Sequence, residues 1–349
     1  MDSSKPVITK ETKNRISVDY EGKLSVKERL MKKLKASHTW IKGVVNVFRF
    51  ILMLGVSYVI LFPFFSKIAG SFMSKTDIVD ATVSLIPKDP TLQIYQAVIV
   101  ENRYFEAFFN TLLLSLLCAI IQTFVACLVG YGLAKFKFKG NGIVMAMVIV
   151  TMIVPHSTLK LAIRRHFNAF ELGHIMSFGT EGPLQSIFGA PISLENSFWP
   201  FVVLSICGLA LKNGLYIYLM RQFFKGVPDE LEESAYVDGS GTVRTFLQII
   251  LPLSIPMMIT IFLFSFSWQW TDQFYVGMFI NDEELLWMFP DVKVVPPSLY
   301  DRNFGAYALY DNVIYNTVGI MIILPLVIMY LFCQKYLVQG IERSGLTAD

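Results

Sequence analysis

The stretch Gly226-Val-Pro-Asp-Glu-Leu-Glu-Glu-Ser-Ala-Tyr-Val-Asp-Gly239 separates two long apolar runs of the chain. Pro228 suits the first turn of a helix, where its missing N–H costs nothing. The four acidic residues between positions 229 and 233 meet the positive end of the helix dipole favourably. Gly239 predicts the end of this helix, because glycine tolerates the left-handed backbone of a C-terminal cap. With a second helix expected over 242–250, the stretch predicts a compact helix–turn–helix between two apolar segments.

The composition places the rest of the chain in a membrane. Of its 349 residues, 54% are hydrophobic and 16% are charged, whereas ordinary globular chains have about 45–50% and about 25%. The excess lies in runs of roughly 20 residues, each long enough to cross a bilayer core of about 30 Å. These runs exclude a soluble enzyme, a disordered tail protein and a disulfide scaffold. The net charge of +3 gives no reason to expect nucleic acid as a partner, and the scattered cysteines and histidines predict no metal site.

Six apolar spans are expected, and they predict an all-α integral membrane protein. They cover 44–65, 110–134, 142–163, 198–220, 251–280 and 313–336. The fifth span is overlong and has Pro252 and Pro256 near its start, which predicts a kinked or tilted helix.

The distribution of Lys and Arg predicts that both termini lie on the cytoplasmic side. Residues 1–42 contain eleven Lys or Arg against five acidic residues. This stretch is too polar for a signal peptide, and we expect a solvated tail over 1–43 with a short amphipathic helix near 26–34. Lys135, Lys137 and Lys139 fill the short link between spans two and three, on the same side. Basic residues between 160 and 165 fall on the opposite side and are an exception to the rule.

The helix–turn–helix also has the spacing of a known motif. It reads Glu233-Ser-Ala235, three residues, Gly239, nine residues, Ile249, one residue and Leu251-Pro252. This pattern resembles the EAA loop of binding-protein-dependent ABC importer permeases, with Ser234 where the pattern has Ala. Both residues are small, so close helix packing is preserved.

Further stretches over about residues 50–341 resemble the carbohydrate branch of these permeases, of the type of the second permease subunit of the maltose importer. In one of them Thr271 replaces the Asn of the family's Trp-Asn-Asp. The stretches are Leu61-Phe-Pro63 with Gly70-Ser-Phe72, Asn110-Thr-Leu112, Gly130-Tyr-Gly-Leu-Ala-Lys-Phe-Lys-Phe138, Arg221-Gln-Phe-Phe224, Trp270-Thr-Asp272, Gln334-Lys-Tyr336 and Val338-Gln-Gly340.

The resemblance implies the six-span fold of type I ABC importer permeases in the membrane of a bacterial cell. The permease domain would cover 44–341, with a core of about 106–336, a coupling loop at 221–252 and a cytoplasmic tail at 342–349. It also implies a second permease subunit, two ATPase subunits that bind ATP and Mg, and an extracytoplasmic solute-binding protein that delivers a sugar. This chain would bind no cofactor, and its sequence contains no Gly-x-x-x-x-Gly-Lys-Ser/Thr motif for ATP. By the same resemblance, Glu233 lies at the contact with the ATPase, or else only caps its helix. The residues that couple this chain to the ATPase would be Glu232, Glu233, Ala235, Asp238 and Gly239.

Polar and aromatic side chains inside the spans are the candidates for the sugar path. A sugar offers hydroxyls to pair and apolar ring faces to stack, and polar groups at bilayer depth are functional candidates by default. Each aromatic residue could equally serve packing or interfacial anchoring. The candidates are Gln122, Asn213, Tyr216, Trp268, Gln269, Trp270, Asp272 and Gln273.

Two outer loops are candidates for contact with other molecules. The loop 282–312 would reach toward the binding protein through Trp287, Phe289 and Tyr300, or its aromatic residues could form a local lid. The loop 164–197 carries clustered cations that suit an acidic sugar such as a uronate, although a solvated loop or a binding-protein contact is favoured.

Three other functions compete with sugar import. An ABC importer of another solute, a peptide or a polyol, would share the EAA loop. An integral-membrane enzyme would show paired carboxylates or a His/Asp cluster at one depth, and the sequence shows neither. A lone channel or secondary transporter often shows repeated halves, and it would leave the helix–turn–helix unexplained.

Overall fold

A computed structural model describes residues 8–11, 17–20, 37–170, 192–282 and 284–343. The chain divides into two compact units, 1–66 and 67–349, which are described separately. The amphipathic helix expected near 26–34, and residues 171–191 of the expected loop 164–197, lie outside the described residues.

The first unit contains a short hairpin and the start of a long helix. Strand β1 (Ile8–Glu11) pairs antiparallel with β2 (Ser17–Tyr20). This hairpin was not predicted from the sequence, which indicated a solvated tail with a short helix here. Helix α2 (Ser37–Gly70) contains the whole of the first expected span and continues into the second unit. Its apolar stretch of 30 residues is long enough to cross a membrane.

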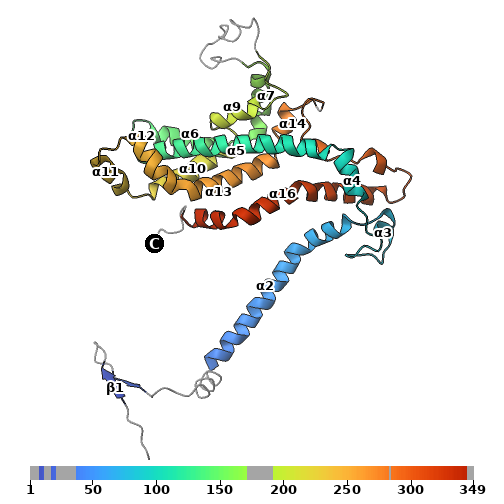
Figure 1. The fold of residues 1–349 in the computed structure, drawn as a ribbon, viewed down its shortest axis with the longest axis horizontal. Helices are drawn as coiled ribbons and strands as arrows, with labels where there is room; N and C mark the ends of the chain where they lie inside the picture. Colours follow the sequence, from blue (N-terminus) through green and yellow to red (C-terminus); the bar gives the residue numbers. More distant parts are fainter. Residues whose placement is uncertain (1–7, 12–16, 21–36, 171–191, 283, 344–349) are drawn as a thin grey trace, which may run out of the picture. The chain divides into compact units, whose positions relative to one another are not determined.

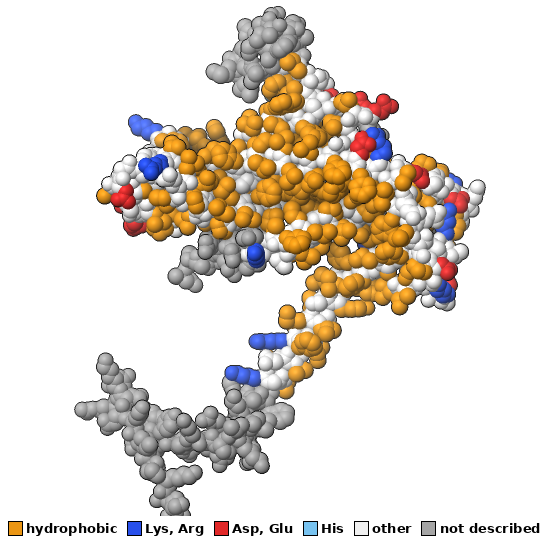
Figure 2. All heavy atoms as spheres, viewed as in Figure 1, with side chains coloured by type: hydrophobic (Ala, Val, Ile, Leu, Met, Phe, Trp, Pro, Cys, Tyr) orange, Lys and Arg blue, Asp and Glu red, His pale blue; other side chains and the backbone are white. Residues whose placement is uncertain are grey.

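The second unit is built around three long helices that lie side by side (Figure 1). Helix α5 (Tyr104–Lys135) packs against α13 (Leu251–Trp270), and α13 packs against α16 (Tyr307–Arg343). The indole of Trp270 donates to the carbonyl oxygen of Ile322 at 2.9 Å and so ties α13 to α16. Hydrophobic side chains cover the middle of this bundle and charged ones gather at its ends (Figure 2), as expected of a membrane protein.

Two of the six expected spans are broken rather than continuous. The third consists of α6 (Asn141–Ile153), the 3₁₀ turn η1 (His156–Leu159) and α7 (Lys160–Asn168), with a bend of 92° at the break. Pro155 lies at the bend, and a proline disfavours helical backbone in the residue before it.

The fourth expected span is two helices, α9 (Trp199–Ile206) and α10 (Asn213–Lys225). Between them the backbone is left-handed at Gly208 (φ 71°) and at Lys212 (φ 65°). Neither helix is long enough to cross a membrane alone. Within the described residues, the structure has four helices of membrane-spanning length, or five if the bent α6–α7 pair is one span.

The fifth span begins at Leu251, as expected, but ends earlier than expected, at Trp270. It is preceded by α12 (Thr242–Thr245) and by the five-residue π-helix η2 (Phe246–Ile250), so the chain is irregular close to the prolines that predict a kink. Helix α13 ends at Trp270 instead of Ile280, because the carboxylate of Asp272 accepts the backbone N–H groups of Phe274 and Tyr275 at 2.9 and 3.1 Å and fixes a turn. A short helix, α14 (Val276–Phe279), follows.

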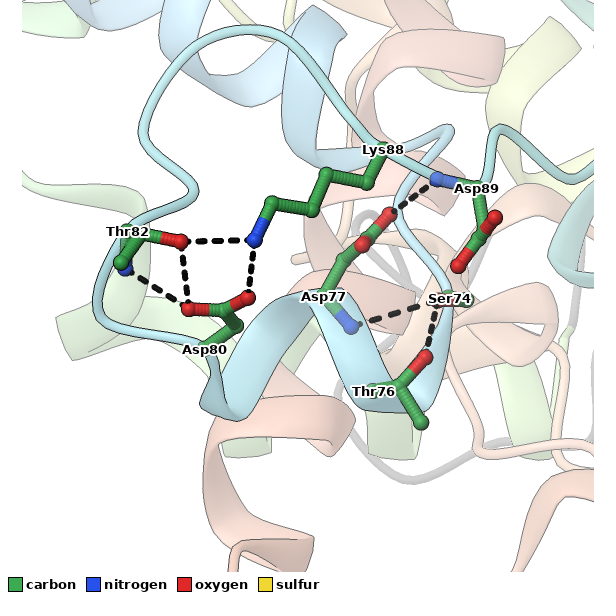
Figure 3. A network of polar contacts seen from close by, with 7 residues as sticks. All are labelled: Ser74, Thr76, Asp77, Asp80, Thr82, Lys88 and Asp89. Atoms are coloured by element: carbon green, nitrogen blue, oxygen red, sulfur yellow. Dashed lines mark hydrogen bonds and ion pairs between the residues drawn. The ribbon is translucent and has the colours of Figure 1, made fainter.

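The outer loops fold onto one end of the bundle. They contain α3 (Lys75–Val79), α4 (Gln93–Val100), α15 (Phe289–Val292) and the 3₁₀ turn η3 (Pro297–Leu299). Lys88 closes the loop after α3 by donating to Asp80 at 2.5 Å and to Thr82 at 2.7 Å (Figure 3). The hydrogen bond from Lys88 holds the pKa of the Asp80 carboxyl well below its usual range.

The close contact between α5 and α10 depends on a glycine. A Cβ added to Gly130 in α5 would lie 2.6 Å from the Met220 Cβ and 3.0 Å from the Arg221 backbone nitrogen in α10. Small residues at such contacts let the backbones of membrane helices approach closely.

We expect Gly130→Ala to destabilise the protein, because overpacking a tight contact costs about 1–3 kcal/mol. The measurement is the melting temperature of the purified protein in detergent. Gly132→Ala is the matched control, since it lies on the same helix with no atom within 4 Å of its added Cβ. Equal melting temperatures for the two variants would contradict the packing described here.

Candidate functional site

The helix–turn–helix expected from the sequence is present as α11 (Glu230–Val237), a tight turn and α12. The start of α11 is anchored to the end of α5. The ammonium group of Lys135 donates to the Val227 carbonyl oxygen at 2.6 Å and to the Asp229 carboxylate at 2.5 Å. This hydrogen bond and the charge of Lys135 lower the pKa of Asp229. The loop is therefore fixed to the membrane helices at its base.

Gly239 forms the turn, as the sequence predicts. Its φ of 81° is left-handed, which a residue with a Cβ adopts only at a cost. The N–H of Gly239 bonds to the carbonyl oxygen of Tyr236 at 3.0 Å, and the N–H of Ser240 bonds to that of Ala235 at 2.9 Å. These two bonds make a Schellman cap, which satisfies the last carbonyl groups of α11.

The predicted coupling residues lie on two different faces of α11. Glu232 and Ala235 are buried against the rest of the subunit. Glu233, Asp238 and Gly239 are exposed. One turn after Glu233, Val237 is 88% exposed, so the outward face of the helix presents an acid next to a bare aliphatic side chain. Such a face at the tip of a fixed protrusion is suited to contact with another protein.

A second group of residues lies where the broken spans meet the end of α13. His156, in the break of the third span, forms a hydrogen bond of 2.5 Å between its Nδ1 and the hydroxyl of Tyr275. Lys212, in the break of the fourth span, places its ammonium nitrogen 4.9 Å from the centre of the Trp268 ring. Lys160 places its ammonium nitrogen 5.9 Å from the centre of the Phe274 ring. Two breaks and the turn after α13 therefore converge, and we call Lys160, Lys212, Trp268 and Phe274 the break site.

The two breaks lie at similar depth in the bundle. Helices α6 and α10 have 13 residues each, which gives a rise of about 20 Å from the end of the unit that carries α11. A Cβ added to Gly214, at the start of α10, would lie 2.4 Å from the Thr151 Oγ1 near the end of α6. The breaks are thus adjacent and within a bilayer core of about 30 Å. Irregular backbone at that depth is tolerated where it is buried in protein or lines a cavity.

Four of the eight predicted sugar-path residues form buried side-chain hydrogen bonds. Gln122 of α5 donates to the hydroxyl of Ser205 at 3.1 Å and accepts from Ser265 at 2.6 Å. Asn213 donates to the Ser205 carbonyl oxygen at 3.3 Å, and Gln269 donates to Asp272 at 3.3 Å. These bonds join α5, α9 and α13, and therefore hold the helices together.

Burial separates the predicted path residues into two sets. Trp268 is 47% exposed and Gln273 is also exposed. The buried set is Gln122, Asn213, Tyr216, Gln269, Trp270 and Asp272.

A pocket of about 140 Å³ is lined in part by the turn after α13. Its lining brings together three predicted path residues, Trp270, Asp272 and Gln273, with Lys293 of the outer loop. Only Gln273 of the three is exposed.

The three residues predicted to contact a binding protein differ in their surroundings. Phe289 is buried and packs against Trp270 with the ring centres 5.0 Å apart. The indole of Trp287 donates to the Asn102 carbonyl oxygen at 2.8 Å. Tyr300 is 53% exposed and accepts a hydrogen bond of 2.6 Å from Arg302. Of the three, Tyr300 has the side chain that is free to meet another protein.

Sequence reasoning missed Lys212 and His156 as site residues. Lys212 lies within the expected span 198–220, and a charged residue inside a span is itself a sign of function. Pro155 inside the expected span 142–163 was the corresponding sign of a break.

Comparison with known proteins identifies a family and several relatives of this chain. Residues 122–343 match the family described as binding-protein-dependent transport system inner membrane component. The galactooligosaccharides transport system permease protein GanQ of Bacillus subtilis (strain 168) is 24% identical over 86% of this chain and 94% of its own. The arabinooligosaccharides transport system permease protein AraQ of the same organism is 26% identical over 85% and 93%.

A solved structure shares the fold. It is a chain of a bacterial ABC transporter involved in the import of the acidic polysaccharide alginate, with a TM-score of 0.63 and 21% identity. The match covers 86% of this chain and 98% of that one.

Proposed function

Since this chain belongs to the family of binding-protein-dependent transport system inner membrane components, we propose that it is a permease subunit of a bacterial carbohydrate importer. The curated relatives that match over most of their length are named for the transport of galactooligosaccharides and arabinooligosaccharides. These names support a sugar or a short oligosaccharide as the substrate class.

The translocation path is formed together with a second permease subunit. The break site supports this role, because its exposed groups lie at bilayer depth and two interrupted helices meet there. Interrupted helices are the usual way in which transporters expose polar groups near the midplane. Alternating access follows when the two subunits rock against each other around this region.

Coupling to ATP hydrolysis takes place at the exposed face of α11. Two ATPase subunits bind ATP and Mg, and each permease inserts its helix into a cleft of one ATPase. In this chain Glu233 and Val237 make the contact, while the buried Ala235 lets α11 lie close to its own subunit. The anchor from Lys135 to Asp229 transmits the movement of α11 to α5.

This function fixes the orientation in the cell membrane. The coupling loop and both termini, including the tail 342–349, are cytoplasmic, and the outer loops face the solute-binding protein. Tyr300 and its neighbour Arg302 are the exposed pair that meets this protein.

The observation that carries the proposal is the fixed α11 turn with its exposed acidic and aliphatic face, in a chain that has no ATP-binding motif of its own. The test is purification from membranes in mild detergent through a C-terminal tag, with the co-purifying chains identified by mass spectrometry. We expect a second permease and an ATPase with a P-loop. Recovery of this chain alone after crosslinking, with transport activity of its own, would contradict the proposal.

A further inference from the structure

Lys160 and Lys212 are unusual cations. Neither forms an ion pair with an acidic side chain anywhere in the described part of the chain. Each rests on an aromatic ring instead, Lys212 on Trp268 and Lys160 on Phe274. Asp272 is close in sequence to the two rings, Trp268 and Phe274. Its carboxylate oxygens accept hydrogen bonds from Gln269 and from two backbone N–H groups instead.

The depth of Lys212 makes its exposure significant. It lies directly before α10, about 20 Å from the end of the unit that carries α11. A lysine exposed to lipid at such a depth costs several kcal/mol, so charged groups there face other helices or a water-filled cavity. The exposed side of Lys212 and Trp268 therefore faces the second permease or the aqueous path.

The backbone also holds Lys212 in place. Its φ of 65° is left-handed, which is uncommon for a residue with a Cβ. The neighbouring contacts fix this conformation, because Asn213 is bound to the Ser205 carbonyl oxygen and Gly214 packs against α6. Non-glycine residues in sparsely populated conformations concentrate at functional sites.

We propose that the break site binds the carboxylate of an acidic sugar, a uronate unit of an oligosaccharide, during passage through the membrane. The inference rests on the proposed function of carbohydrate import and narrows its substrate class. The ammonium of Lys212 pairs with the carboxylate, and the exposed face of Trp268 stacks on the apolar face of the sugar ring. Lys160, above Phe274, offers a second ammonium group to a neighbouring uronate unit.

The chemistry favours an anionic sugar over a neutral one. A neutral sugar needs amide and hydroxyl groups that both donate and accept, whereas lysine only donates. A hydrogen bond between an ammonium group and a carboxylate is roughly twice as strong as a neutral one. Two lysines without acidic partners, on aromatic rings, therefore match a carboxylate on a ring-shaped ligand.

The test uses the complete importer, purified with its partners and its binding protein and placed in vesicles. The probes are matched pairs of labelled oligosaccharides: galacturonate and galactose, glucuronate and glucose, mannuronate and mannose. We expect uptake of an acidic member of one pair by the wild type. Lys212→Gln lowers this uptake at least tenfold, because it removes the positive charge. The size of the side chain and the cost of its left-handed backbone stay nearly unchanged. Lys212→Arg retains most of the uptake, and Lys139→Gln, in the exposed link between α5 and α6, serves as a neutral control.

The outcomes separate this inference from the proposed function. Uptake of neutral sugars alone, at the same rate in the wild type and Lys212→Gln, would overturn the acidic-sugar inference and leave the carbohydrate importer intact. Uptake of neither class, by a complex that hydrolyses ATP in response to another solute, would overturn the proposed function itself.

Discussion

Replacing Glu233 with Lys is expected to abolish sugar uptake while the protein still inserts and assembles with the second permease. Glu233 is exposed on the outward face of α11, so its replacement leaves the packing of the subunit unchanged. A reversed charge in the contact with the ATPase introduces like-charge repulsion or an unpaired buried charge, either of which costs several kcal/mol. Uptake of labelled oligosaccharide in cells should fall at least a hundredfold, with an unchanged amount of protein in the membrane.

The matched control for Glu233→Lys is Lys139→Glu. It also reverses a charge at an exposed position on the side of the membrane that carries the coupling loop, but outside α11. This variant should transport like the wild type. Full uptake by the Glu233→Lys variant would show that α11 does not dock on the ATPase.

Replacing Gly239 with Val is expected to give the second largest effect. The left-handed backbone at this position costs roughly 1–2 kcal/mol for a residue with a Cβ, and more for a β-branched one. The space around Gly239 is open, so the effect arises from the backbone and not from a clash. The Schellman cap then opens, α11 loses its fixed orientation, and uptake should fall at least tenfold in the same cell assay.

Two variants isolate the backbone effect at Gly239. Gly241→Val should be tolerated, because Gly241 has an ordinary φ of −78° and open space around it. Gly239→Asn should retain much of the uptake, since asparagine enters the left-handed region more readily than other residues. Equal losses in Gly239→Val and Gly241→Val would show that the turn itself is not the cause.

The coupling loop could be predicted in detail because its signals are local. Pro228, the acidic run and Gly239 each act within a few residues, and the structure confirms the helix, the turn and the second helix. The long spans could also be predicted, since the length of the apolar run alone identifies α2, α5, α13 and α16.

The breaks in spans three and four could not be located by hydropathy. An apolar stretch has the same mean hydropathy whether its helix is straight or bent. The stretches 142–163 and 198–220 were therefore expected to be single helices. The break of the fourth span depends on left-handed backbone at Gly208 and Lys212. At Lys212 no local motif indicates this conformation, which is accompanied by the hydrogen bond from Asn213 to Ser205 and by the contact of Gly214 with α6.

Which individual side chains are buried and which are exposed could not be predicted from the sequence either. Tyr216 and Trp268 are both aromatic residues within spans, yet Tyr216 is fully buried and Trp268 is half exposed. Ala235 and Glu233 belong to the same motif and face opposite ways on α11. Which face of a helix is buried depends on its neighbours in space, and an all-round apolar helix carries no periodic signal for it.

The most direct test of the central claim, that α11 docks on an ATPase, is site-directed crosslinking from Val237. A Val237→Cys variant, with the less buried Cys207 and Cys333 replaced by alanine, is labelled with a maleimide photocrosslinker in native membranes. The account predicts a crosslinked product whose second chain is a P-loop ATPase, and loss of this product in Glu233→Lys. A product that contains only this chain or lipid, in membranes where the importer is active, would contradict the account.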